Sequence, residues 1–161
     1  MNLREQISHY IPYTTQEAKE QEVILKYIDT FDNLLTRENE FAHFTASAWI
    51  VNPERTKVLM AYHNIYQSWS WVGGHADGNA NLLQVALKET TEETGLTQII
   101  PLATTIYSVE ILGVPSHIKK GNPIATHLHL NVTYLIEANE TEQTMVNEDE
   151  NSAIKWMELE E

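Results

Sequence analysis

One segment in the middle of the chain constrains the fold more than any other: a glycine-rich stretch that runs directly into a helix pattern. The stretch covers residues 73–80, and the helix pattern covers residues 81–96. Asn81 can cap the N-terminus of this helix, and Gly95 suits the left-handed conformation that commonly follows a helix C-terminus. The segment therefore predicts a loop followed by a short, capped helix.

Three glutamates share one face of this predicted helix. At about 100° of rotation per residue, Glu89, Glu92 and Glu93 stand at i, i+3 and i+4. Carboxylates at the C-terminal end of a helix repel one another and meet the negative end of the helix dipole, so a cation should compensate them. Magnesium is usually held by a few carboxylates, with water and substrate phosphates completing its shell. The spacing alone fits both a metal site and a solvated acidic face.

An apolar stripe lies beside the glutamates and is expected to fasten the helix to a sheet. The stripe consists of Leu83, Ala86, Leu87 and Thr90.

A second helix is predicted over residues 14–35, where Thr14 and Glu17 resemble a capping box and apolar residues recur at helical spacing.

Alternating and β-branched runs predict strands on both sides of the loop and helix. Residues 41–51 and 57–63 flank a turn-like segment and indicate a hairpin. After the helix, a second strand pair is expected over about 105–112 and 126–138, joined by a link rich in turn formers, and a last short strand over 153–157. Residues 137–151 are densely acidic and predict an exposed loop.

The predicted strand 126–138 has one polar and one apolar face. His127, His129, Asn131 and Thr133 alternate with apolar residues, so one face is expected to be buried and the other to meet something polar. His127 and His129 are therefore candidates for lining a cleft, although ordinary buried or exposed histidines fit the same pattern.

Composition narrows the class of protein. The chain has no cysteine, which excludes disulfides, thiolate metal sites and a cysteine nucleophile. A net charge of −13 disfavours nucleic acid as a partner. The first residues lack the basic start and apolar run of a secretory signal, and no stretch reaches the length of a membrane span. We expect a cytoplasmic protein that does not enter a membrane.

The spacing from Gly74 to Leu96 resembles the Nudix box, GX5EX7REUXEEXGU, in which U is aliphatic. Residues that fall on the pattern are Gly74, Glu89, Glu92, Glu93, Gly95 and Leu96. Three positions depart from it. Ala80 replaces a glutamate and removes a supporting carboxylate, Lys88 replaces an arginine but keeps a positive charge one helical turn from Glu92, and Thr90 replaces an aliphatic residue.

The resemblance implies a fold and a domain organisation. We expect an α/β (α+β) protein, a Nudix-like α/β/α sandwich with a mixed β-sheet, the loop and helix of the box, and an extra N-terminal helix. The whole chain, 1–161, would be a single domain with a helical extension at 1–38 and a core at 41–157. Members of the family often continue with a helix after the last strand, so a chain shortened at its C-terminus stays open.

The resemblance also implies a magnesium or manganese site. Its ligands would be the carbonyl of Gly73 with Glu89, Glu92 and Glu93, and Glu150 is expected to assist, with Glu148 as the second choice. Glu89 is the first candidate for general base, and Lys88 is expected to orient Glu92. The substrate would contact Trp71, Gly74, His127 and His129.

The activity implied is hydrolysis of a diphosphate (pyrophosphate) linkage in a nucleoside diphosphate derivative or a similar small phosphorylated metabolite. One alternative, motivated by Ala80 and Lys88, is a catalytically weak nucleotide-binding regulatory module. An enzyme like isopentenyl diphosphate isomerase is a weaker alternative, because that chemistry normally needs a cysteine. The partner is expected to be a small-molecule diphosphate, and a homodimer is left open.

Overall fold

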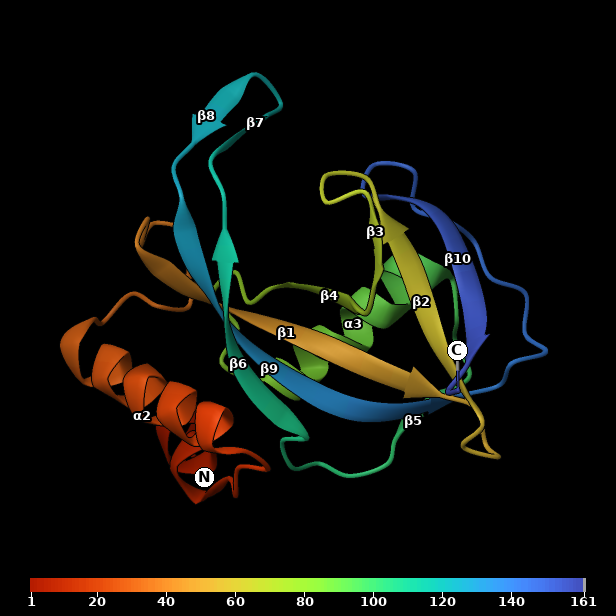
Figure 1. Cartoon of the computed structure of the whole chain (residues 1–161), viewed down its shortest axis with the longest axis horizontal. Helices are drawn as coiled ribbons and strands as arrows, with labels where there is room; N and C mark the ends of the chain where they lie inside the picture. The colour runs from red at the N-terminus through yellow and green to blue at the C-terminus, as the bar shows by residue number, and fades with distance from the viewer. Residues whose placement is uncertain (161) are drawn as a thin grey trace.

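The computed structural model describes residues 1–160. A mixed β-sheet of eight strands forms the centre of the molecule (Figure 1). Its main path runs β10-β2-β1-β9-β5, with β3 beside β2, β4 beside β1 and β6 beside β9. The pair β1–β9 is parallel, and the other pairs are antiparallel. The sheet strands are β1 (Ala42–Val51), β2 (Lys57–His63), β3 (Ser68–Ser70), β4 (Val72–His75), β5 (Ile99–Pro101), β6 (Ser108–Val114), β9 (His127–Ala138) and β10 (Asn151–Glu158).

Strand β1 organises the sheet because it has partners on both sides. Along one side it pairs with β9 over its whole length, from Ala42 opposite Leu128 to Val51 opposite Glu137. Along the other side, β4 pairs with its middle, from Thr45 to Ala48, and β2 with its far end. The glycine-rich segment is thus held in the sheet, directly beside the strand that also contacts β9.

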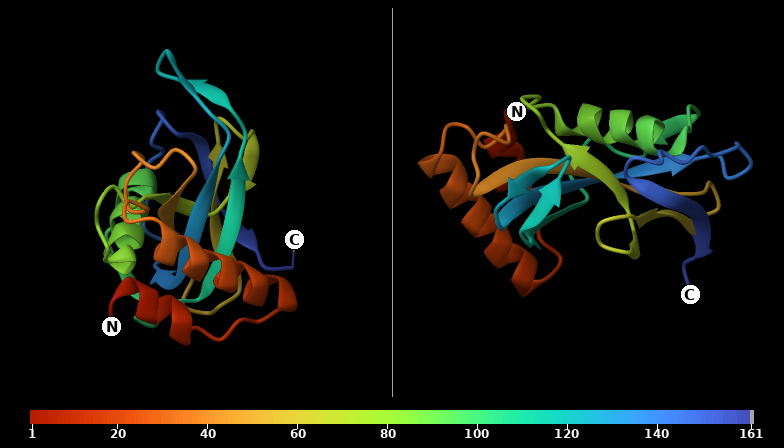
Figure 2. Two further views of the ribbon diagram at one scale, coloured as in Figure 1. Left: turned by 90° about the vertical axis from the view of Figure 1, so that its left-hand side faces the viewer. Right: turned by 90° about the horizontal axis from the view of Figure 1, so that it is seen from above.

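Helix α3 (Leu82–Thr94) covers one face of the sheet, where it contacts β1 and β4 (Figure 2). Asn81 Oδ1 accepts a hydrogen bond from the amide of Gln84 at 3.1 Å, and Gly95 adopts φ 77°, so both predicted caps are confirmed. The buried stripe differs from the predicted one, because Leu82, Val85, Ala86 and Thr90 are buried whereas Leu83 and Leu87 are only half-buried.

Two helices precede the sheet, α1 (Leu3–His9) and α2 (Thr15–Thr30), and α2 packs against β6. The predicted helix over 14–35 is wrong at its C-terminus, which lies at Thr30. Phe31 is already extended, and the amide of Thr36 bonds the carbonyl of Asn33 in a turn. Turn formation by these polar residues therefore ends the helix although the apolar spacing continues. Helix α1 was not predicted.

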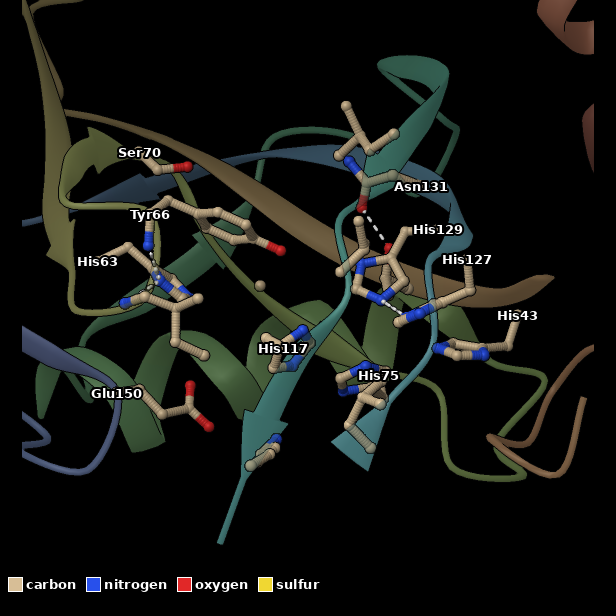
Figure 3. Close-up of a pocket in the computed structure, with 18 of the residues that line it drawn as sticks. His43, His63, Tyr66, Ser70, His75, His117, His127, His129, Asn131 and Glu150 are labelled. Atoms are coloured by element: carbon tan, nitrogen blue, oxygen red, sulfur yellow. Dashed lines mark hydrogen bonds between the residues drawn. The ribbon is translucent and has the colours of Figure 1, made fainter. Parts of the chain in front are cut away.

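Strands β1 and β9 each present a polar face and an apolar face. The predicted alternation in β9 is confirmed: His127, His129 and Asn131 point to the same side (Figure 3). Because β1 and β9 are parallel and pair His43 with His129 and Thr45 with Asn131, the polar residues of β1 lie on the same face.

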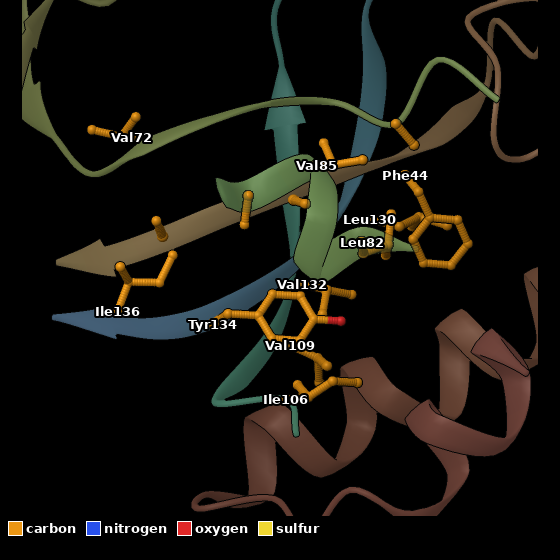
Figure 4. Packing of buried hydrophobic residues seen from close by; sticks show 14 of the residues in the cluster. Phe44, Val72, Leu82, Val85, Ile106, Val109, Leu130, Val132, Tyr134 and Ile136 are labelled. Atoms are coloured by element: carbon orange, nitrogen blue, oxygen red, sulfur yellow. The ribbon is translucent and has the colours of Figure 1, made fainter. Parts of the chain in front are cut away.

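The opposite faces of these strands form the core (Figure 4). Apolar side chains from β1 and β9 meet the buried stripe of α3, and they alternate with the polar residues just described. The largest side chains that are fully buried include Phe44, Leu82, Leu130, Tyr134 and Ile136.

The remaining predicted strands are present with shifted ends. The hairpin of 41–51 and 57–63 is confirmed as β1 and β2, β6 lies later than the predicted 105–112, and β10 extends beyond 153–157 at both ends. The link before β9 forms a projecting hairpin of β7 (His117–Lys119) and β8 (Asn122–Ile124) (Figure 1). The loop expected over 137–151 is shorter, because Glu137 lies in β9 and Asn151 in β10.

The predicted fold class, an α/β (α+β) arrangement of a mixed sheet with helices, is confirmed. Within residues 1–160, no helix combines the length and the hydropathy needed to cross a bilayer.

Leu82 tests the attachment of α3 to the sheet. Its side chain is 1% exposed, and replacing a buried leucine by alanine leaves a cavity and costs about 3 kcal/mol of unfolding free energy. We expect this loss in Leu82→Ala by urea denaturation, against less than half of it in the matched control Leu83→Ala. Equal losses in the two variants would contradict the packing described here.

Candidate functional site

The glycine-rich strand β4 makes room for a glutamate of α3. Gly73 pairs with Ser47 and Gly74 with Ala46, so the two glycines present opposite faces of β4. A Cβ atom built on Gly74 would lie 2.6 Å from Oε1 of Glu89. Glu89 therefore rests directly on the backbone of Gly74, in the space that any side chain at this position would occupy.

Burial and neighbouring charges act strongly on two of the three helix glutamates. Burial first, and then repulsion from Glu92 and Glu150, raises the pKa of Glu89 to about 7. Glu93 is 5% exposed. Burial raises the pKa of Glu93 well above its usual range, and a hydrogen bond and charge from the Glu150 carboxyl raise it further. These shifts indicate that the half-buried Glu89 and the buried Glu93 share one space with the carboxyl of Glu150, a residue that is itself exposed.

Glu150 reaches this space from the loop before β10. Its backbone carbonyl accepts a hydrogen bond from the amide of Asn64 at 2.9 Å, which holds the loop against the end of β2. The neighbouring Asn151 is 2% exposed, and its side chain acts on the Glu93 carboxyl, whose pKa it lowers in part.

Glu92 lies differently from its two neighbours on α3. Its side chain is exposed, and its carboxylate lies 3.7 Å from the ammonium of Lys88, one helical turn earlier. The predicted proximity of Lys88 and Glu92 is therefore present. Among the predicted acidic residues, Glu148 is also exposed, and its backbone carbonyl accepts a bond from the Asn64 side chain.

A cleft opens beside the carboxyls and has two connected compartments. The larger has a volume of about 680 Å³ and includes the predicted substrate contacts Trp71, His127 and His129 in its wall. The smaller, about 470 Å³, is lined by Glu89 together with Arg37, Lys119 and Lys120. The residues common to both walls are Arg37, Gly74, His75, Lys119, Ile124, Asp149 and Glu150.

A buried hydrogen-bond chain fixes the floor of the larger compartment. The indole N–H of Trp71 donates to Ser47 Oγ at 3.0 Å, and Ser47 donates to Asn131 Oδ1 at 2.8 Å. Asn131 in turn donates to Glu110 at 2.9 Å. Because each donor has an acceptor, Trp71 is held in one orientation at the cleft wall.

Four histidines gather at the other end of this compartment (Figure 3). The ring centroid of His43 lies 5.3 Å from that of His75, 4.9 Å from His127 and 5.1 Å from His129. Burial, followed by the charges of Arg37 and His43, lowers the pKa of His75 to about 3. Burial and the charges of the other histidines lower that of His129 to the same value. These two imidazoles are neutral at physiological pH.

The carboxyls fit a hard divalent cation. Within residues 1–160, no lysine or arginine forms an ion pair with Glu89, Glu93 or Glu150. Buried carboxylates without a compensating charge are costly, and Mg²⁺ prefers a small set of carboxylate oxygens. The structure thus brings Glu89, Glu93 and Glu150 together, whereas Glu92 and Lys88 lie on the exposed side of α3.

Two histidines at the site were not predicted. His43 starts a polar alternation with Thr45 and Ser47 that parallels the one recognised in β9, so the pattern was present in the sequence. His75 directly follows the two glycines. Only the pairing of β1 with both β4 and β9 shows that these histidines meet His127 and His129.

Comparisons with known proteins agree with this geometry. A family model described as NUDIX domain matches residues 41–161. The Xenopus laevis protein named m7GpppN-mRNA hydrolase NUDT17 is 32% identical over 112 residues, which cover 66% of this chain. The chain spans only 36% of the length of that relative.

Solved structures show the same fold at lower identity. A C. elegans Ap4A hydrolase in a binary complex has 24% identity and a TM-score of 0.50 over 73% of this chain and 80% of its own. The E. coli dihydroneopterin triphosphate pyrophosphohydrolase has 18% identity and a TM-score of 0.51 over 71% of this chain and 80% of its own. At these identities the likeness concerns the fold.

The raised pKa values predict a stability that depends on pH and on metal. A carboxyl whose pKa is higher in the folded state than in the unfolded chain costs stability once the unfolded chain ionises, and the loss is complete when the folded carboxyl ionises too. Metal-free protein should therefore lose stability as the pH rises above about 4.5, with the share of Glu89 complete near pH 7 and that of Glu93 near pH 9, so the loss from pH 7 to 9 comes mainly from Glu93. Saturating Mg²⁺ should remove this loss. His75 and His129 oppose this loss only slightly, because burial lowers their folded-state pKa and an unfolded histidine, with a pKa of about 6.5, is already mostly neutral at pH 7.

Thermal unfolding midpoints at pH 7, 8 and 9, with chelator or with Mg²⁺, measure this effect. Glu93→Gln should flatten the decline in chelator, whereas Glu148→Gln, an exposed change in the neighbouring loop, should keep it. A midpoint for chelator-treated wild type that does not change over this range would show that the carboxyls are not crowded.

Proposed function

This chain belongs to the Nudix hydrolase family, and from that premise we propose that it hydrolyses the diphosphate linkage of a small phosphorylated metabolite with the aid of Mg²⁺ or Mn²⁺. The observation that carries the proposal is the gathering of Glu89, Glu93 and Glu150 beside the backbone of Gly74, at the edge of a two-compartment cleft.

The proposed metal ligands are the carboxylates of Glu89, Glu93 and Glu150 and the carbonyl of Gly73. Glu92 is exposed and paired with Lys88, so we assign it a supporting place at the rim. A divalent cation bound here would offset the charge of the diphosphate and acidify a coordinated water molecule. The protein's own contribution is to hold the carboxylates together before the cation arrives, through burial on α3 and the absence of a side chain at Gly74.

Glu89 is the proposed general base. In the hydrolysis, water oxygen forms a bond to phosphorus while the bond to the bridging oxygen breaks, and the proton released by the water needs an acceptor. A carboxylate beside a cation-bound water lies in the right place to accept that proton. Glu89 also lines the smaller compartment, where the diphosphate would lie.

The two compartments suggest how a substrate would be divided. Lys119 and Lys120, on the β7–β8 hairpin, and Arg37 place positive charge at the smaller compartment and suit phosphate oxygens. Tyr66, Trp69 and Trp71 line the larger compartment and suit a flat organic group. Its volume of about 680 Å³ is that of a small-molecule pocket.

The acidity of the chain argues for a small substrate. The Xenopus relative is named for an mRNA substrate, but a net charge of −13 repels a long polyanion. A nucleoside diphosphate derivative is small enough to bind in the cleft without a further basic surface.

A cytoplasmic location and a homodimeric state stay predictions from the sequence.

A nucleotide-binding module without turnover is the second candidate. It is favoured by Ala80, which is exposed and places no carboxylate where the box has one. Binding of a nucleotide with no product formed, in the presence of either Mg²⁺ or Mn²⁺, would support this module in place of the enzyme.

Hydrolysis is tested on a panel of nucleoside diphosphate derivatives with Mg²⁺ or Mn²⁺, by chromatography of the products. At least one compound should be cleaved at its diphosphate linkage. Glu89→Gln, Glu93→Gln and Glu150→Gln should each lower kcat by on the order of 100-fold, because each loses a carboxylate at the cation or the reacting water. Glu148→Gln, whose side chain lies outside the cleft, should stay near wild type. Equal losses at positions 148 and 150 would contradict the assignment of Glu150.

Gly74→Ala tests the contact between β4 and Glu89. The added methyl group would overlap the Glu89 carboxyl, so turnover should fall by on the order of 100-fold, as for loss of a general base. Gly113→Ala is the matched control for folding alone, because a Cβ there meets open space although the residue lines the larger compartment. Unchanged kinetics in Gly74→Ala would mean that Glu89 works from another position.

A further inference from the structure

The four histidines of the larger compartment come from three neighbouring strands. His43 lies on β1 opposite His129 of β9, and His75 lies on β4 opposite Thr45, two residues further along β1. His127 precedes His129 by two residues and shares its face of β9. Three hydrogen-bonded strands therefore deliver four imidazoles to one place, and the positions are fixed by the sheet (Figure 3).

The ring nitrogens are spaced like the ligands of a metal ion. One nitrogen each from His43, His75 and His129 lie within 4.8 Å of one another. Nε2 of His127 accepts a hydrogen bond of 3.2 Å from Nε2 of His129, and an ion bound to both nitrogens would replace that proton. Tetrahedral zinc with nitrogen ligands at about 2.0–2.1 Å places those nitrogens about 3.4 Å apart, so small side-chain movements would close the set around an ion.

Two of the rings are already held in the protonation state that a metal needs. Nδ1 of His43 donates to the carbonyl of Asn39 at 3.0 Å, and Nδ1 of His127 donates to the carbonyl of Ala125 at 2.8 Å. A carbonyl can only accept, so the proton is on Nδ1 and the lone pair is on Nε2. Metal-binding histidines are commonly fixed in this way by a backbone carbonyl.

His43 supplies an independent sign that a partner is missing. It is 5% exposed, and its Nε2 has no hydrogen-bond partner. A buried lone pair without a donor costs free energy, and such groups in native proteins call for an explanation. A bound cation would satisfy it.

The donor atoms of the cluster select the kind of ligand. They are imidazole nitrogens, and the guanidinium of the nearby Arg37 is paired with Asp77. Neutral imidazole is the ligand form preferred by Zn²⁺ and related transition metals, whereas Mg²⁺ prefers oxygen.

We propose that His43, His75 and His129, with His127 in reach as a fourth ligand, form a second metal site that binds a transition-metal cation, Zn²⁺ foremost, apart from the carboxylate site. All four histidines line the larger compartment, so an ion there is accessible to a bound small molecule. With three protein ligands, the remaining position would accept water or a donor atom of that molecule. The site does not depend on the proposed hydrolysis.

The test uses the full chain after removal of metals by a chelator. Zn²⁺ alone is titrated into it by calorimetry in excess Mg²⁺, and bound metal is counted by elemental analysis after gel filtration. Wild type should bind one Zn²⁺ per chain that Mg²⁺ does not displace. His43→Gln, His75→Gln and His129→Gln should each weaken binding by more than about 10-fold.

Two controls separate this site from other histidines and from the glutamates. His117→Gln, which changes a histidine of the same cleft outside the cluster, should keep the wild-type affinity. A Glu89→Gln, Glu93→Gln, Glu150→Gln triple variant should also keep it, even if hydrolysis is absent from every protein tested. Thermal unfolding identifies any variant that fails to fold. In that case the Zn²⁺ affinity of wild type is compared with that of His75→Gln, because this position is only half-buried.

Tetrahedral Co²⁺ has an intense visible absorption, which gives a second readout of histidine ligation. The spectrum should appear with wild type and be absent with His129→Gln. Zn²⁺ affinity that is equal in wild type and the three histidine variants, or that disappears in the glutamate variant, would overturn the proposal.

Discussion

The double pairing of β1 is the interaction on which the rest of the structure depends. Its parallel contact with β9 and its antiparallel contact with β4 place three strands in fixed register. Because side chains alternate across a strand, this register sends polar residues to the cleft and apolar residues to α3. A one-residue slip of either neighbour would exchange the two faces and dismantle both the core and the cleft.

The same register creates two adjoining environments with different chemistry. On the α3 side of β4, the bare backbone of Gly74 admits Glu89, the buried Glu93 lies close to it, and the exposed Glu150 adds a further negative charge. On the cleft side, His75 joins three other imidazoles in one cluster. Hard cations and phosphates suit the first environment, and softer cations suit the second. His75 and Gly74 line both compartments, so a single small molecule can contact both environments.

Features encoded over a few residues could be predicted from the sequence. The caps of α3 depend on Asn81 and Gly95 alone, the helical spacing of the glutamates needs only the pitch of a helix, and the alternation in β9 is read directly from residues 127–136. The C-terminus of α2 could not be predicted, because polar turn contacts after Thr30 override the apolar spacing. The short α1 was missed although Asn2 and Glu5 form a capping box.

Features that depend on the pairing of segments far apart in the chain could not be predicted from the sequence pattern. The three helix glutamates look equivalent in spacing, but the fold buries Glu93 and leaves Glu92 exposed beside Lys88. His43 and His75 are far from His127 and His129 along the chain, and only the shared partner β1 brings them together. The departures at Ala80, Lys88 and Thr90 proved to be local: Ala80 is exposed, Lys88 still pairs with Glu92, and Thr90 bonds the carbonyl of Ala86.

The most direct measurement of the central claim counts the protons released when a hard cation binds. Carboxyls that crowd one another are partly protonated near neutral pH, and a cation must displace those protons. Calorimetric titration of Mn²⁺ into Zn²⁺-free protein at pH 7, repeated in buffers of different ionisation enthalpy, gives that number. The account predicts net proton release that decreases in Glu93→Gln. Binding without proton release, or release that is unchanged in this variant, would contradict it.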